Sequence, residues 1–72
     1  MDIRKQVGLN VQRLRRELGW SQEDLALESG LHRTYISGIE RGVRNPTVLV
    51  LQKMADTLGV DAAELLVAGK KR

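Results

Sequence analysis

The sequence contains no cysteine, one histidine and one proline among its 72 residues. Because cysteine is absent, the chain can form neither disulfide bonds nor thiolate metal sites. One histidine without converging carboxylates leaves nothing from which to assemble a nucleophile or a metal centre. We therefore expect no cofactor, no metal ion and no enzymatic activity.

Aromatic residues and long apolar runs are also scarce. Tryptophan and tyrosine occur once each and phenylalanine not at all, so aromatics make up 3% of the chain. Proteins that bind single-stranded nucleic acid usually stack bases on several aromatic rings. No apolar run approaches the roughly 20 residues of a membrane span, and the N-terminus lacks the apolar core of a signal peptide. We expect a soluble, cytoplasmic protein with no membrane partner.

Positive charge is in modest excess. Twelve lysines and arginines stand against nine acidic residues, which gives a net charge of +3. This excess favours a polyanionic partner without deciding the question alone, and the shortage of aromatic rings makes duplex DNA the preferred polyanion. The chain is long enough for one domain and too short for a second core. We therefore expect no effector domain and no small-molecule ligand.

Apolar residues near the start of the chain follow the spacing of an amphipathic helix. They are three or four positions apart: Ile3, Val7, Val11, Leu14 and Leu18. Gly8 interrupts this pattern and weakens a helix by about 1 kcal/mol relative to alanine. We expect another helix to pass close to this glycine.

Two short helical patterns with a tight break between them follow. The first opens at Ser21, whose hydroxyl can accept a backbone N–H, and Asp24 can reach back as in a capping box. It ends at Gly30, where a left-handed conformation costs little. Apolar positions resume at Ile36 and Ile39 in the second pattern. The stretch is predicted to form a helix-turn-helix.

The second helix of this pair carries small, polar and basic residues on its outer face. If Ile36 points into the core, steps of about 100° per residue turn Thr34, Ser37, Gly38 and Arg41 outward. The DNA major groove is wide enough for a helix and displays hydrogen-bonding base edges. This helix is therefore the predicted DNA reader.

An ordered set of residues resembles the lambda-repressor/Cro-like helix-turn-helix family of the XRE type. The matching positions are Gln22, Ala26, Gly30, Ile36 and Ile39, and the similarity covers roughly residues 3–67. The resemblance implies an all-α, compact five-helix lambda-repressor-like domain. Segments 33–41 and 44–47 are similar to restriction–modification controller proteins and also to many stand-alone repressors, so a phage-type repressor and an antitoxin remain open.

The expected domain spans residues 1–69, with a basic tail at 70–72. Its helices are expected over residues 2–18, 21–29, 32–41, 47–58 and 61–68. The resemblance also implies an ion pair between Arg15 and Glu40 that ties the first helix to the third. It further gives Gln22 a phosphate contact at the start of the second helix.

Base contacts are predicted at the start and on the outer face of the reader helix. These residues are His32, Arg33, Thr34, Ser37 and Gly38. Arg33 can pair in bidentate fashion with O6 and N7 of a guanine, or contact a phosphate instead. Thr34 and Ser37 can contact bases or bond to their own helix. Gly38 either lets a base approach closely or marks a lost contact.

The remaining phosphate contacts are predicted beside the reader helix. Arg41, Arg44 and Asn45 lie in or next to the turn that follows it, where adjacency to the groove favours contacts with the DNA backbone. Tyr35 lies on the flank of the helix, against the DNA backbone or the preceding helix.

More apolar residues follow than one small core can bury. They are Leu49, Val50, Leu65, Leu66 and Val67, and the surplus suggests a surface for homodimerisation.

These features together predict a sequence-specific, duplex-DNA-binding transcriptional regulator. One reader helix contacts too few base pairs to select a genomic site, so we expect a homodimer on a pseudo-palindromic operator. Bound there, it would block or recruit RNA polymerase. The alternative is a protein-binding adaptor that uses the same helix pair without DNA, and its mark would be an apolar or acidic outer face on the reader helix.

Overall fold

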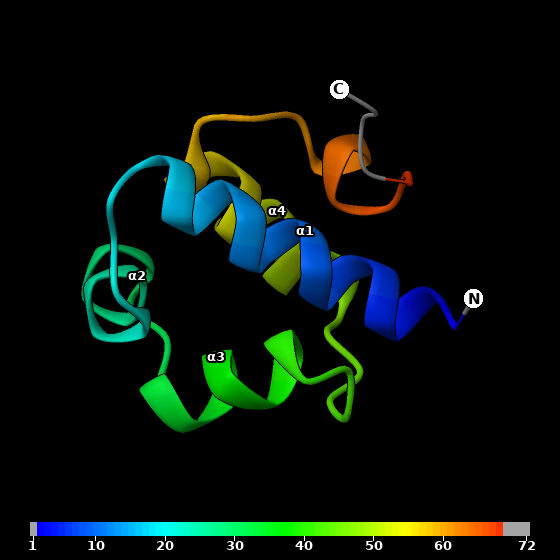
Figure 1. Cartoon of the computed structure of the whole chain (residues 1–72), viewed down its shortest axis with the longest axis horizontal. Helices are drawn as coiled ribbons and strands as arrows, with labels where there is room; N and C mark the ends of the chain where they lie inside the picture. The colour runs from blue at the N-terminus through cyan, green and yellow to red at the C-terminus, as the bar shows by residue number, and fades with distance from the viewer. Residues whose placement is uncertain (1, 69–72) are drawn as a thin grey trace.

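The computed structural model describes residues 2–68, and these residues form four α-helices and one short 3-10 helix (Figure 1). They are α1 (Ile3–Glu17), α2 (Gln22–Ser29), α3 (Arg33–Glu40), α4 (Val48–Leu58) and η1 (Ala62–Leu65). The predicted all-α class is confirmed. The tail predicted at residues 70–72 lies outside the described residues.

The last helix was predicted over residues 61–68, and the structure corrects both its type and its length. It is the four-residue 3-10 helix η1. Asp61 stands at its start but makes no side-chain capping bond. At its other end Asn10 of α1 donates to the backbone carbonyls of Leu65 and Val67. A tertiary contact that no local pattern encodes therefore ends this helix.

Side-chain caps fix where α2 and α4 begin. Ser21 and Asp24 form both bonds of the predicted capping box, at 3.0 and 2.8 Å. Thr47 accepts the backbone N–H of Val50 at 3.1 Å at the start of α4. Gly30 ends α2 with a φ of 75°, a left-handed conformation that glycine adopts without steric cost.

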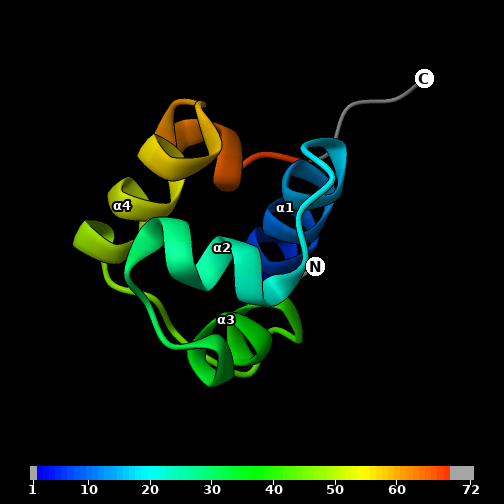
Figure 2. The ribbon, with the colours of Figure 1, turned by 90° about the vertical axis from the view of Figure 1, so that its left-hand side faces the viewer.

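The helices pack around α1 and leave α3 at an edge. α1 contacts α3, α4 and η1, while α2 contacts α3 and α4. Figures 1 and 2, two views a quarter turn apart, both place α3 along the border of the molecule, with the other helices on one side of it. One face of α3 is therefore free of neighbouring helices.

The core lies between the facing sides of the helices and includes one residue of η1. Its buried apolar side chains are Val7, Val11, Leu14, Leu25, Ile36, Ile39, Leu51, Met54, Ala55, Leu58 and Leu65. The buried apolar stripe of α1 is shorter than the sequence spacing predicted. Ile3 is 54% and Leu18 47% exposed, because they stand at the two ends of α1, beyond the packed middle.

The expected close approach at Gly8 is confirmed. A Cβ atom at this position would collide with the backbone carbonyl oxygens of Ile39 and Glu40. α1 and the end of α3 therefore touch backbone to backbone. This contact sets the distance between α1 and α3.

Candidate nucleic-acid interface

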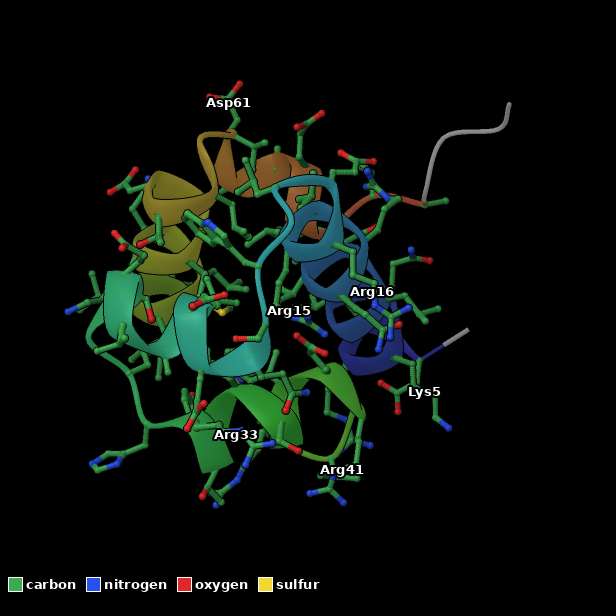
Figure 3. All side chains as sticks on the ribbon, turned by 60° about the vertical axis from the view of Figure 1, so that its left-hand side comes forward. Lys5, Arg15, Arg16, Arg33, Arg41 and Asp61 are labelled. Atoms are coloured by element: carbon green, nitrogen blue, oxygen red, sulfur yellow. The ribbon has the colours of Figure 1, made fainter. Side chains whose placement is uncertain are left out.

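The free face of α3 carries polar and basic side chains. His32, Arg33 and Thr34 at its start are exposed, and Ser37 is partly exposed. Arg41, directly after the helix, is exposed as well. In Figure 3, Arg33 and Arg41 both project from the lower border of the molecule, away from the other helices. These side chains could therefore contact a large ligand laid against this edge.

Gly38 is covered by the side chain of Arg44 in this structure, and the base contact expected there stays a prediction. The residue is buried, and a Cβ atom on it would lie 2.5 Å from Cγ of Arg44. The backbone N–H groups of Val43 and Arg44 both donate to its carbonyl, at 3.0 and 3.3 Å. The missing side chain makes room for the stem of Arg44.

Arg44 in turn lies against Tyr35. Its guanidinium carbon is 5.7 Å from the centroid of the tyrosine ring, within the range of a cation–π contact. Tyr35 is partly buried against the core. The turn after α3 is thus held beside the free face, with its arginine lying across Gly38. Asn45, the next residue, is exposed.

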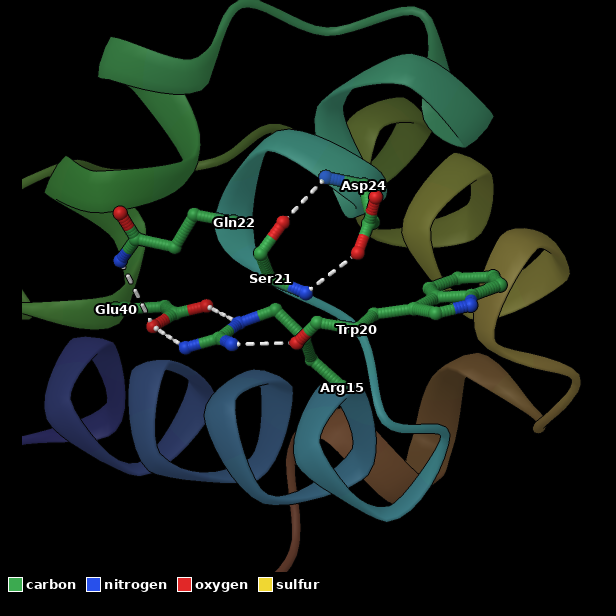
Figure 4. Close-up of polar contacts among 6 residues, drawn as sticks. All are labelled: Arg15, Trp20, Ser21, Gln22, Asp24 and Glu40. Atoms are coloured by element: carbon green, nitrogen blue, oxygen red, sulfur yellow. Dashed lines mark hydrogen bonds and ion pairs between the residues drawn. The ribbon is translucent and has the colours of Figure 1, made fainter.

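Behind the free face, Arg15 of α1 and Glu40 of α3 form the expected ion pair (Figure 4). Arg15 donates from Nε to Oε2 of Glu40 at 2.7 Å and from Nη2 to Oε1 at 2.9 Å. It also donates from Nη1 to the backbone carbonyl of Trp20 at 2.8 Å. Both charged residues are buried. This bidentate pair fixes α3 on α1.

Gln22 joins this pair, although the family resemblance implied a phosphate contact for it. Its Nε2 donates to Oε1 of Glu40 at 3.0 Å, as Figure 4 shows. At least one N–H of the carboxamide is therefore directed into the protein, where it helps satisfy a buried carboxylate. Sequence analysis missed this contact because it depends on how α2 and α3 cross.

The surroundings of Glu40 keep it ionised. Burial alone would raise the pKa of its carboxyl, but hydrogen bonds from Arg15 and Gln22 outweigh burial, and the pKa is lowered from its ordinary value. The hydrogen bond to Glu40 raises the pKa of Arg15. A pair that is charged at neutral pH and has its hydrogen bonds satisfied is suited to holding helices together.

Charge is distributed unevenly over the molecule. Lys5 at the start of α1 lies beside Gly42, at the end of α3, and so adds a positive charge near Arg41. Figure 3 places Asp61 at the opposite end of the molecule from Arg33 and Arg41. Lys5, Arg33 and Arg41 therefore make the α3 edge locally positive.

The apolar residues predicted for a dimer surface divide into two groups. Leu49 is 82% exposed, and Leu66 and Val67 are 42% and 54% exposed. Val50 is partly buried against the core. Leu65 is completely buried, so its assignment to the dimer surface is wrong. Leu65 anchors η1 in the core, and Leu66 and Val67 follow it on the outside.

The described residues hold neither a cluster of metal ligands nor a helix that could span a membrane. Among residues 2–68, no three or more histidine, cysteine, aspartate or glutamate side chains lie together as metal ligands would. None of the helices in the same range has the length and apolar character to cross a bilayer.

Comparison with known proteins gives a consistent result. Residues 11–65 match the model of the family HTH_3, described as helix-turn-helix. The HTH-type transcriptional regulator y4dJ of Sinorhizobium fredii, itself uncharacterised, is 52% identical over 66 residues, which cover 92% of this chain and 86% of that protein.

Two solved structures are similar as well. The restriction–modification controller protein C.AhdI from Aeromonas hydrophila has a TM-score of 0.83 at 40% identity, over 86% of this chain and 94% of the other. The biofilm master regulator SinR in complex with DNA has a TM-score of 0.81 at 34% identity, over 85% of this chain and 98% of the other.

Proposed function

This chain belongs to the helix-turn-helix family HTH_3, and we propose that it is a transcriptional regulator that binds a pseudo-palindromic duplex-DNA operator as a homodimer. The observation that carries the proposal is the free face of α3, with exposed Arg33 and Thr34 and partly exposed Ser37. A helix with such a face fits the major groove, where these side chains meet base edges.

We assign a DNA contact to each residue of the free face and of the turn after it. Arg33 forms a bidentate pair with a guanine, and Thr34 and Ser37 contact neighbouring bases. His32, exposed at the N-terminal end of α3, lies near the base edges as well. Arg41, Arg44 and Asn45 contact phosphates from the turn, with Tyr35 beside them. Such phosphate contacts set the orientation of the protein on the duplex.

The homodimer supplies the specificity that one domain lacks. Two reader helices about 34 Å apart reach successive major grooves on one side of the duplex. The exposed apolar side chains of Leu49, Leu66 and Val67 are the proposed contact surface between the two copies. Because that surface stands on α4 and the segment after η1, it leaves the free face of α3 open to DNA.

The regulation we propose is by occupancy. A dimer on its operator blocks or recruits RNA polymerase, and protein concentration decides how often the operator is filled. Because the controller C.AhdI has 40% of its residues in common with this chain over 94% of its own length, control of a restriction–modification system is the role we favour. A phage-type repressor and an antitoxin are the alternatives.

Selection of bound sequences from a random duplex pool tests this function. We expect a two-fold symmetric consensus from the wild-type chain. Arg33→Ala should lower affinity by about 1–3 kcal/mol and remove the preference at one position of each half-site. Arg16→Ala, at an exposed arginine on α1, is the matched control and should leave the consensus unchanged.

Two outcomes would contradict the proposal. If Arg33→Ala weakens binding to all sequences equally, Arg33 does not read a base. If the wild-type chain fails to bind random duplex even at low salt, where phosphate contacts are strongest, the DNA function falls and a protein-binding adaptor takes its place.

A further inference from the structure

Asn10 is a buried polar residue that the DNA-binding face does not use. It stands on α1 with 1% of its surface exposed. Its Nδ2 donates to the backbone carbonyl of Leu65 at 2.9 Å and to that of Val67 at 2.7 Å. Its Oδ1 accepts from Nη2 of Arg13 at 3.4 Å. Both ends of the carboxamide are therefore bonded.

The segment that Asn10 holds has little structure of its own. η1 has four residues, and after it the backbone N–H of Leu66 bonds only locally, to the carbonyl of Ala63 at 3.0 Å. A single 3-10 turn is marginal without tertiary contacts. Among the described residues, the side-chain hydrogen bonds that reach the segment 65–67 all come from Asn10.

Two anchors consequently decide where Leu66 and Val67 point. The first is the side chain of Leu65, which is completely buried in the core. The second is the Asn10 carboxamide, which binds the carbonyl before Leu66 and the carbonyl of Val67. With the backbone fixed at both points, Leu66 and Val67 are presented outward while Leu65 stays inside.

We infer that Asn10 is a positioning residue for self-association. It holds the segment 65–67 in the conformation in which Leu66 and Val67 meet a second copy of the chain. This inference rests on the proposed homodimer. It adds that the Asn10 carboxamide orders the part of the dimer surface formed by Leu66 and Val67. A surface that is already ordered in the monomer loses less conformational entropy when two copies associate.

The Asn10→Leu substitution removes both donors and keeps a side chain of similar size. The control is Ser29→Ala, which also removes a buried polar side chain but acts at the end of α2, where Ser29 bonds within its own turn. Dimer dissociation constants come from sedimentation over a concentration series, and circular dichroism reports the fold.

We expect Asn10→Leu to raise the dimer dissociation constant at least tenfold while its helical signal is retained. Ser29→Ala should lower the melting temperature and leave the dissociation constant unchanged. If Asn10 has only a structural role, Asn10→Leu should behave like Ser29→Ala. Both variants would then have a lower melting temperature and an unchanged dimer dissociation constant. A folded Asn10→Leu variant that dimerises like the wild type would overturn the inference.

A second measurement needs no variant and applies even if Asn10→Leu fails to fold. If Asn10 prepares the surface in advance, its bonds to the carbonyls of Leu65 and Val67 must already be formed in the monomer. We expect the side-chain amide protons of Asn10 in the dilute, monomeric wild-type chain to exchange slowly with solvent. Exchange as fast as that of an exposed carboxamide in the monomer would overturn the inference.

Failure of the proposed function gives a different result. A wild-type chain that is monomeric at the concentrations at which it binds DNA removes the homodimer, and the role of Asn10 falls with it. A wild-type dimer that is indifferent to Asn10 removes only the inference.

Discussion

Glu40 is the residue on which the attachment of α3 depends most. Its buried carboxylate accepts two hydrogen bonds from Arg15 and one from Gln22, so residues of three helices meet at one charge. Removing one partner of a buried ion pair leaves the other charge uncompensated, which costs far more than the loss of a surface pair.

We expect Glu40→Gln to lower the melting temperature by roughly 10–20 °C, the effect of about 3 kcal/mol in a domain of this size. Thermal unfolding followed by circular dichroism measures the change. Glu17→Gln is the matched control, because Glu17 pairs with Arg13 at 3.4 Å with 60% of its side chain exposed. That variant should melt within a few degrees of the wild type.

Acid should remove the contribution of Glu40. Its pKa in the folded chain is lowered from the ordinary value of 4.5, so the stabilisation is complete above that pH and disappears as pH falls through the folded pKa. The melting temperatures of the wild type and Glu40→Gln should therefore converge as pH falls below 4.5. A constant difference down to pH 3 would contradict the role assigned to this carboxylate.

Gly38 offers a test of how Arg44 is placed. In Gly38→Ala the new Cβ would lie 2.5 Å from Cγ of Arg44. Because Cγ lies near the root of the side chain, the whole stem must rotate away from this position. The higher helix propensity of alanine, about 1 kcal/mol, offsets this rearrangement, so the melting temperature should stay close to that of the wild type. Operator affinity should fall by roughly tenfold, the worth of one contact by a charged group. Fluorescence anisotropy with the selected operator measures this.

A double-mutant cycle assigns the cause of that loss. With Arg44 already replaced by alanine, Gly38→Ala has no stem to displace and should cost nothing further. An equal loss in both backgrounds would mean that the methyl group itself obstructs the DNA.

Residues whose partners lie within one turn were predictable, and those whose partners come from another helix were harder. Ser21 and Asp24 form the capping box because local geometry alone brings them together. Gln22 donates a hydrogen bond to Glu40, which is 18 positions away in the sequence. Arg44 covers Gly38 because the turn after α3 folds back over the helix. The resemblance to a known family supplied Arg15 and Glu40 as a pair.

At the scale of elements, the contact between α1 and α3 depends on Gly8. We expect Gly8→Ala to destabilise the chain by about 1–3 kcal/mol, the usual cost of overpacking, despite the higher helix propensity of alanine. The atoms in the way are the backbone oxygens of Ile39 and Glu40, so α3 itself must move. Thermal unfolding measures the loss.

Gly38→Ala is the natural control for this substitution. Both glycines stand in helices and both have a close neighbour, but at Gly38 the neighbour is a flexible side chain and at Gly8 it is backbone. Gly8→Ala should therefore lower the melting temperature clearly, and Gly38→Ala should leave it nearly unchanged. Equal melting temperatures for the two variants would mean that α1 and α3 are less tightly packed than the structure indicates.

Element boundaries were predictable where caps mark them and not where a tertiary contact decides. Thr47 and Gly59 delimit α4 as a local pattern requires. The end of η1 depends on Asn10, which is 55 positions away from Leu65. The surplus of apolar residues suggested a surface position for Leu65, whereas the short 3-10 helix turns it into the core.

For the whole molecule, the proposed function requires two separate surfaces. The basic edge along α3 carries Arg33 and Arg41 (Figure 3), and the exposed apolar set of Leu49, Leu66 and Val67 stands on α4 and the segment after η1. A positive edge attracts DNA at long range and orients the approach. In the proposed homodimer the apolar surface would pair the two copies, and only such a pair would read an operator of full length.

Leu49 provides the matched test of that pairing. It is 82% exposed, and Leu27 on α2 is 81% exposed, so replacing either by serine removes the same exposed side chain from the monomer. Leu49→Ser should raise the dimer dissociation constant by roughly tenfold or more, the effect of about 1.5 kcal/mol of lost apolar burial. Leu27→Ser should not change it. Sedimentation over a concentration series measures both constants.

DNA binding should follow dimerisation by mass action. At concentrations below the new dissociation constant, Leu49→Ser must fill the two-fold operator less completely than the wild type, while its affinity for a single half-site stays the same. Half-site binding therefore separates a damaged dimer from a damaged reader helix. If Leu27→Ser weakens dimerisation and Leu49→Ser does not, the copies meet through α2, and the surface on α4 needs another explanation.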